Sequence, residues 1–163
     1  MKHVKKSVLL FYSAREMYDL VVRVEDYPQF LPWCESTTIL DRRPADPAAE
    51  RAEEVTARLT LSYAGVHQSF TTRNEQVPGE SVRLCLVDGP FSLLDGTWRF
   101  APVQPQGQQP VGDMPVACRV EFDLAYAFSN RAFEAVLSPV FDRIANTFVD
   151  SFVRRAEVVH GER

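Results

Sequence analysis

Apolar and polar residues alternate along much of the chain, and this two-residue period predicts antiparallel strands. In the clearest stretch, residues 117–128, apolar side chains at the even positions alternate with Arg119, Glu121 and Asp123. Ala64-Gly65 predicts a two-residue hairpin turn between two such stretches. The strands predicted in this way cover residues 54–63, 66–70, 82–86, 96–101 and 117–128, and β-branched and aromatic residues predict a first strand over 4–12.

A capping box predicts the start of a first helix at Ser13, because its hydroxyl and the carboxylate of Glu16 can each accept the other residue's backbone N–H. The helix is predicted over residues 14–24. Pro28 stops it, since the residue before a proline is pushed toward an extended conformation. The stretch 27–34 is rich in large apolar side chains but holds two prolines. We expect it to form a short turn of helix that plugs one end of a barrel-like sheet.

A second, longer helix is predicted to begin after Ser129 or Asn130, either of which can cap it. Its apolar positions recur at three- and four-residue steps, which is typical of an amphipathic helix. They are Phe133, Leu137, Val140, Phe141, Ile144, Phe148 and Phe152. Pro139 lies inside this pattern and predicts a kink or an offset of the first part of the helix.

The predicted order is strand, helix, short helix, a run of antiparallel strands and one long helix. This order is typical of an α+β domain with helices on one face of an antiparallel sheet. We expect residues 1–163 to form a single domain, in which a curved sheet of about six or seven strands wraps around the long C-terminal helix. Residues 102–115 are rich in Pro, Gln and Gly and have no period, so we interpret them as a mobile hairpin loop.

Charge and composition narrow the class of protein. The net charge of −4 argues against DNA binding, since release of counterions requires a basic surface. Cys34, Cys85 and Cys118 have neither the spacing of a zinc site nor that of a disulfide framework, and we interpret them as reduced thiols. The sequence shows no signal peptide and no membrane-spanning stretch. We expect a soluble cytoplasmic protein, and a peripheral contact with the inner membrane stays open.

The sequence carries none of the common catalytic motifs. It has no nucleophile elbow, zinc-protease motif, P-loop or dinucleotide-binding glycine pattern. His3 and His160 lie near the ends of the chain, and His67 lies on the face of its strand opposite Phe70. We therefore predict that the protein is not an enzyme and that it uses neither a metal nor a cofactor.

An apolar binding site needs no catalytic group. Burial contributes about 0.8 kcal/mol per CH₂, so an isoprenoid tail of about ten carbons offers about 8 kcal/mol before the ordering costs. The predicted stripes of Phe, Trp, Leu and Val can line such a site. The same stripes can also form an ordinary core without a cavity, and the pattern alone leaves both interpretations open.

Four motifs stand out beyond these patterns. They are YPQFLPWC at 27–34, FTTRN at 70–74, DGPF at 88–91 followed by Leu94, Gly96 and Trp98, and FVRRA at 152–156. In this order they resemble the coenzyme Q-binding, START-like proteins of the polyketide cyclase and lipid transport superfamily. Bacterial members include ribosome association toxins of the RatA type. The resemblance extends from Val4 to about Gly161, and the stretch from Pro102 to Pro115 has no counterpart in it.

The resemblance implies a helix-grip fold, which agrees with the order of elements. It also implies that ubiquinone or a related isoprenoid lipid is the ligand, that the protein acts as a quinone carrier or chaperone supporting respiration, and that it touches a membrane surface transiently. An alternative implied by the same family is a toxin that binds the large ribosomal subunit and blocks subunit joining. The acidic charge favours the first, although Lys2, Lys5 and Lys6 can form a local basic patch. A polyketide cyclase or aromatase is a weaker alternative.

Ten apolar residues are the candidate ligand contacts. A lid or plug at the mouth of the cavity is expected from Phe30, Leu31 and Trp33. The wall is expected from Phe70, Phe91, Leu94 and Trp98, and the helix face from Phe141, Ile144 and Phe148.

Overall fold

The computed structural model describes residues 1–46, 49–103 and 117–162. Within these ranges, seven strands form one antiparallel sheet in the order β1-β7-β6-β5-β4-β3-β2. The strands are β1 (Lys2–Leu10), β2 (Cys34–Asp46), β3 (Ala49–Tyr63), β4 (Val66–Val77), β5 (Ser81–Asp88), β6 (Phe91–Val103) and β7 (Ala117–Phe128). The helices are α1 (Ala14–Val22), the 3-10 helix η1 (Val24–Gln29) and α2 (Arg131–His160).

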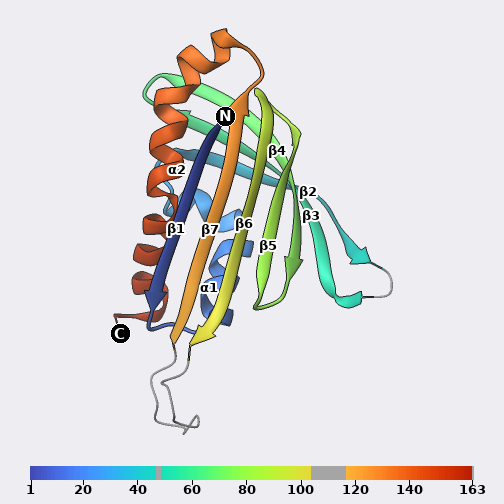
Figure 1. The fold of residues 1–163 in the computed structure, drawn as a ribbon, viewed down its shortest axis with the longest axis vertical. Helices are drawn as coiled ribbons and strands as arrows, with labels where there is room; N and C mark the ends of the chain where they lie inside the picture. Colours follow the sequence, from blue (N-terminus) through green and yellow to red (C-terminus); the bar gives the residue numbers. More distant parts are fainter. Residues whose placement is uncertain (47–48, 104–116, 163) are drawn as a thin grey trace, which may run out of the picture.

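The sheet bends around the helices, as Figure 1 shows, and β2 and β3 run obliquely behind the other strands. The predicted α+β class, with a curved antiparallel sheet and a long C-terminal helix, is confirmed. Of the predicted mobile loop, Pro102 and Val103 belong to β6, and residues 104–116 lie outside the described residues.

The alternation in residues 117–128 produces the predicted half-buried strand. β7 pairs with β1 on one side and with β6 on the other, so it lies inside the sheet. Its even-numbered side chains point into the core. Those that are buried are Cys118, Val120, Phe122, Leu124 and Tyr126. The predicted turn between β3 and β4 is also present, with φ angles of 51° at Ala64 and 81° at Gly65. Two positive φ angles are what a type I′ hairpin turn requires.

Strand β2 was not predicted, and its pairing explains why. Its register with β3 shifts between Cys34 and Ser36, between Ile39 and Asp41, and again after Pro44. Each shift interrupts the alternation of side chains between the two faces. A search for a two-residue period therefore finds no strand in this stretch. For a related reason β6 begins at Phe91, five residues before the predicted start, since its register shifts after Phe91.

The first helix begins as predicted and ends earlier. Ser13 Oγ accepts the backbone N–H of Glu16 at 2.9 Å, and Glu16 Oε1 accepts the backbone N–H of Ser13 at 2.9 Å, so the capping box is confirmed. Helix α1 ends at Val22, and η1 continues the chain with Pro28 inside it. The predicted short helical turn thus lies over residues 24–29 and leads into β2.

Helix α2 is unbroken from Arg131 to His160, although it contains Pro139. The Oδ1 atom of Asn130 accepts the backbone N–H of Phe133 at 2.8 Å, which identifies Asn130 as the N-cap. Figure 1 shows the first turns of α2 inclined to the rest of the helix. Proline removes one backbone donor and crowds the preceding turn, which accounts for this bend. The remaining turns lie along the inner face of the sheet.

Candidate ligand-binding cavity

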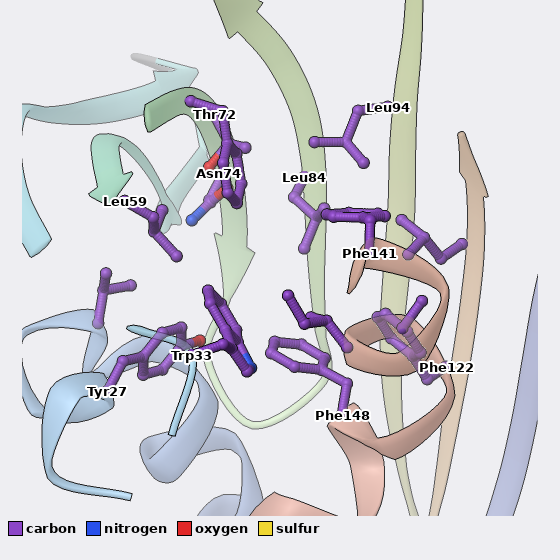
Figure 2. A pocket seen from close by; sticks show the side chains of 15 residues that line it. Tyr27, Trp33, Leu59, Thr72, Asn74, Leu84, Leu94, Phe122, Phe141 and Phe148 are labelled. Carbon is purple, nitrogen blue, oxygen red and sulfur yellow. The ribbon is translucent and has the colours of Figure 1, made fainter. Parts of the chain in front are cut away.

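A cavity of about 80 Å³ lies between the inner face of the sheet and the helices η1 and α2 (Figure 2). The strands contribute Leu59, Phe70, Thr72, Asn74, Leu84, Leu94, Phe122 and Leu124 to its wall. The helices and the segment between η1 and β2 contribute Val24, Tyr27, Trp33, Phe141, Ile144, Ala145 and Phe148. The lining is mainly apolar, so the centre of the fold has room for a small apolar group.

Gly96 on β6 keeps part of this space open. A Cβ atom at this position would lie 2.9 Å from Leu84 Cδ1 and 3.1 Å from Leu124 Cδ1, and both leucines line the cavity. Any side chain at Gly96 would therefore push these two leucines into the cavity. This is the close approach for which a glycine inside a strand is suited.

Aromatic rings from α2 meet rings from the sheet and from the segment before β2. Phe141 lies edge-on to Phe91 and Tyr126, with ring centroids 4.9 Å and 4.8 Å apart. Phe148 meets Trp33 at 6.2 Å, and Figure 2 shows the two side by side in the cavity wall. Such contacts contribute about 0.5–1.5 kcal/mol per pair beyond the area that they bury. They hold α2 against the sheet around the cavity.

Tyr27 closes the η1 side of the cavity. Its hydroxyl donates a hydrogen bond of 2.5 Å to the backbone carbonyl of Val21. Burial of the side chain raises the pKa of Tyr27 above its ordinary value, and the hydroxyl stays protonated. The phenol is thus satisfied within the protein and presents only its ring to the cavity.

The β4 side of the wall is polar. Thr72 and Asn74 follow Phe70 on the inward-facing positions of β4 and are 4% and 7% exposed (Figure 2). Among the described residues, the buried Oδ1 atom of Asn74 has no hydrogen-bond partner, and the same is true of Nε2 of Gln76, two residues further along β4. An unsatisfied buried polar atom costs about 1–3 kcal/mol. These two amides are therefore the sites of unused hydrogen-bonding capacity next to the cavity.

The N-terminal half of α2 is fastened to the sheet by a polar network. Asp142 accepts hydrogen bonds from the Tyr126 hydroxyl, from Lys2 Nζ and from the Ser138 hydroxyl. Burial alone would raise the pKa of Asp142, but the hydrogen bonds from Lys2 and Tyr126, the charge of Lys2 and the hydrogen bond from Ser138 together hold it below its usual range. The network joins the edge strand β1, its neighbour β7 and α2.

The cavity is small for a lipid. An apolar cavity of about 150 Å³ is known to hold one benzene molecule, and ligand sites for larger molecules reach about 300–1,000 Å³. At about 80 Å³ this cavity is smaller than either. A ring with a tail would enter only if wall side chains such as Leu84, Leu94 and Ile144 turned aside. The cavity as it stands therefore has room for only part of such a ligand.

The structure brings together six of the ten candidate contacts. Those that line the cavity are Trp33, Phe70, Leu94, Phe141, Ile144 and Phe148. Phe91 contacts Phe70 and Phe141 just behind the wall. Trp98 is 1% exposed and packs on Phe122 and Phe152. Contact of these residues with a ligand stays a prediction.

Phe30 and Leu31 also lie away from the cavity wall. Leu31 is 1% exposed in the core, and the ring of Phe30 packs edge-on against Phe152 with centroids 5.1 Å apart. The segment that was expected to form a lid therefore contributes only Tyr27 and Trp33 to the wall. Nine wall residues were not predicted as contacts. They are Val24, Tyr27, Leu59, Thr72, Asn74, Leu84, Phe122, Leu124 and Ala145.

The three histidines lie away from the cavity wall. His67 pairs with Glu35 at an exposed position, and His3 pairs with Asp123 on the sheet surface. His160 lies near the end of α2, 3.4 Å from Glu16. Within the described residues, neither α1 nor α2 has the length and apolar composition needed to cross a bilayer.

Residues 10–153 match the family model for polyketide cyclase/dehydrase and lipid transport proteins. The chain belongs to this family. The ribosome association toxin RatA of Pseudomonas aeruginosa is 37% identical over 159 residues, which are 98% of each chain. The mitochondrial coenzyme Q-binding protein COQ10 homolog B of Xenopus laevis is 25% identical over 97% of this chain and 59% of its own. The relatives named here are thus a toxin and a binding protein.

Solved structures agree with the family in fold. The solution structure of an 18 kDa protein from Caulobacter crescentus superposes with a TM-score of 0.69 at 28% identity and covers 99% of both chains. A START superfamily protein from Mycobacterium smegmatis superposes with a TM-score of 0.59 at 19% identity and covers 93% of this chain and 92% of that one. The predicted resemblance to START-like proteins is therefore confirmed for the fold.

Proposed function

We propose that this protein binds an isoprenoid lipid, with a ubiquinone-like molecule as the leading candidate, between the sheet and α2. The observation that carries the proposal is the cavity, whose wall is apolar except for the β4 edge at Thr72 and Asn74. Such a wall suits a molecule with a long apolar part and a small polar head. The similarity to a coenzyme Q-binding protein supports the same ligand class.

In this proposal the protein is a carrier or chaperone and not a catalyst. It shields the lipid from water, transfers it at the surface of the inner membrane and so supports respiration from the cytoplasm. Each CH₂ group removed from water contributes about 0.8 kcal/mol, so the tail supplies most of the affinity. The three histidines lie away from the cavity wall, which supports binding over acid–base chemistry.

The test is to identify the lipid that the protein carries. Protein purified from a quinone-containing host should release an isoprenoid lipid into organic solvent, and mass spectrometry should identify it. Protein stripped of lipid should then bind added short-tailed ubiquinone. Protein that is repeatedly empty and does not bind added ubiquinone would contradict the proposal.

A second candidate function is association with the large ribosomal subunit. The observation that favours it is the 37% identity to the RatA toxin of Pseudomonas aeruginosa over 98% of each chain. The basic patch expected for such a role is partly neutralised, because Lys2 bonds Asp142 and Lys5 Nζ lies 3.9 Å from Asp123 Oδ2. Overexpression followed by sucrose-gradient analysis tests it: free subunits should increase at the expense of assembled ribosomes. An unchanged profile would contradict this second role.

A further inference from the structure

The inward face of β4 carries hydrogen-bonding groups that the protein itself does not use. Asn74 is 7% exposed and Gln76 is 4% exposed, and both lie on the same face of the strand as Thr72. The buried Oδ1 of Asn74 and the buried Nε2 of Gln76 have no hydrogen-bond partner in the part of the chain that the structure describes. Burying such groups without partners destabilises the protein, so a purely structural role does not explain them.

The neighbours of Asn74 in the sheet do not satisfy its side chain. Across the ladder it lies opposite Val55 on β3 and Leu84 on β5, and both are apolar. Gln76 lies opposite Glu53 on β3, and the carboxylate of Glu53 is bound by Arg42 at 3.3 Å. The side chain of Asn74 forms part of the cavity wall. A partner for Oδ1 therefore has to come from the cavity side.

We propose that Asn74 Oδ1 accepts a hydrogen bond from a hydroxyl on the head group of the ligand, and that Gln76 Nε2 donates to an oxygen of the same head group. This inference rests on the proposed lipid-binding function and adds to it the chemical form of the ligand. The form is a quinol or another phenol with an apolar tail. In the orientation that the structure gives the Asn74 amide, a quinone, which has only acceptor oxygens, leaves Oδ1 without a partner, whereas a quinol hydroxyl both donates and accepts.

The spacing along β4 suits one aromatic head group. Residues two apart on a strand face the same way and are about 6.5–7 Å apart, so the two amides can reach neighbouring oxygens of one ring. Gln76 is buried two residues beyond the wall residue Asn74, so the head group would extend the cavity along β4. The apolar wall formed by Leu59, Leu84 and Leu94 then remains for the tail.

The test compares three probes with the same ten-carbon tail under anaerobic conditions. They are a decyl-substituted ubiquinol, the corresponding quinone and decylbenzene, which has no oxygen. We expect the wild type to bind the quinol about tenfold more tightly than the quinone, measured by calorimetry. The substitution Asn74→Leu should weaken quinol binding about tenfold and leave decylbenzene binding within about twofold.

A stability measurement separates this site from a structural role. Asn74→Leu replaces an unsatisfied amide with an apolar side chain of similar shape, so ligand-free protein should unfold at an unchanged or higher temperature. Gln76→Met should weaken quinol binding in the same way. Gln68→Met on the same strand and face serves as the matched control, because Gln68 Nε2 already donates to the backbone carbonyl of Ser69 at 3.4 Å, and this change should leave quinol binding unchanged.

Two results would overturn the inference and leave lipid binding intact. One is equal affinity of the wild type for quinol and quinone, and the other is unchanged quinol binding by both Asn74→Leu and Gln76→Met. Failure of the wild type to bind any of the three probes would overturn the inference together with the proposed lipid-binding function. A fall in unfolding temperature of Asn74→Leu without a change in binding would assign Asn74 a structural role.

Discussion

The guanidinium carbon of Arg155 lies 5.1 Å from the ring centroid of Phe30, and Arg155 also donates a hydrogen bond of 3.0 Å to Gln29 Oε1. Two sequence motifs that are far apart in the chain, at 27–34 and 152–156, therefore contact each other. Phe152 strengthens the contact, since its ring centroid lies 5.1 Å from that of Phe30. The motifs act as one unit that fastens the segment before β2 to the second half of α2.

Arg155→Ala should loosen this segment. Loss of the cation–π contact and of the hydrogen bond should lower the free energy of unfolding by about 1 kcal/mol. Amide hydrogen exchange should increase over residues 27–34 and stay unchanged in β7. Arg154→Ala is the matched control, because Arg154 is exposed on the same helix. Equal effects of the two substitutions would contradict the fastening role of Arg155.

Gly89→Ala should be strongly destabilising. Gly89 has a φ angle of +153°, and a Cβ atom there would lie 2.8 Å from Phe70 Cβ. Backbone strain costs about 1–3 kcal/mol, and the clash adds to it. Gly65→Ala is the control, since Gly65 has a positive φ angle but nothing within 4 Å of a Cβ atom. Urea unfolding should show a larger loss for Gly89→Ala, because the contact with Phe70 Cβ adds to the backbone strain there.

The Asp142 network should make stability depend on pH in the acidic range. Because the pKa of Asp142 is lowered in the folded protein, its contribution is present above the pKa of an unfolded aspartate, about 3.9, and is lost as pH falls through the folded value. Asp142→Asn should therefore be less stable than the wild type at neutral pH, and this difference should shrink as the pH falls below about 3.9. Asp150→Asn, at an exposed position of α2, is the control and should show no such change. A difference independent of pH would count against the network.

Ala145→Leu should block the ligand. Ala145 is 2% exposed and lines the cavity, so the added carbons occupy space that a lipid would need. Lipid recovered by solvent extraction should fall, as should binding of added ubiquinone. Ala135→Leu makes the same change at an exposed position of the same helix and should leave both quantities unchanged. Full lipid content in Ala145→Leu would mean that the ligand binds elsewhere.

The cysteines should differ in reactivity. Burial raises the pKa of both Cys34 and Cys118 to about 11, so very little thiolate forms at about pH 8. Cys85 is the partly exposed cysteine of the three. A thiol reagent should modify one cysteine rapidly, and Cys85→Ser should remove that rapid phase. Three equally fast thiols in the folded protein would contradict this burial.

Much of the fold can be predicted because most strands keep a strict alternation. In β7 every inward position is apolar, and the pattern predicted both ends of the strand, Ala117 and Phe128. β2 was missed because three register shifts remove the alternation on which such a prediction depends. The start of β6 was placed late because Phe91 is followed by a register shift.

The site was harder to predict than the fold. Apolar character predicts Phe70 as a wall residue but does not predict Thr72 and Asn74, although all three occupy even positions of one strand. Their spacing of two residues from Phe70 along the strand is thus the signal that can place Thr72 and Asn74 on the inner face. Phe30 and Trp98 have the large aromatic side chains expected of a ligand contact. In the structure both rings pack against Phe152. An aromatic side chain alone does not separate the two uses.

The cavity beside Gly96 also makes the protein compressible at one place. Hydrostatic pressure favours states that eliminate internal voids, and a void of about 80 Å³ bounded by leucines can be closed by small rotations of their side chains. A protein filled by its ligand has lost this void and should resist pressure better than the empty one. The resistance of the protein to pressure would then indicate, without any label, whether a lipid is bound.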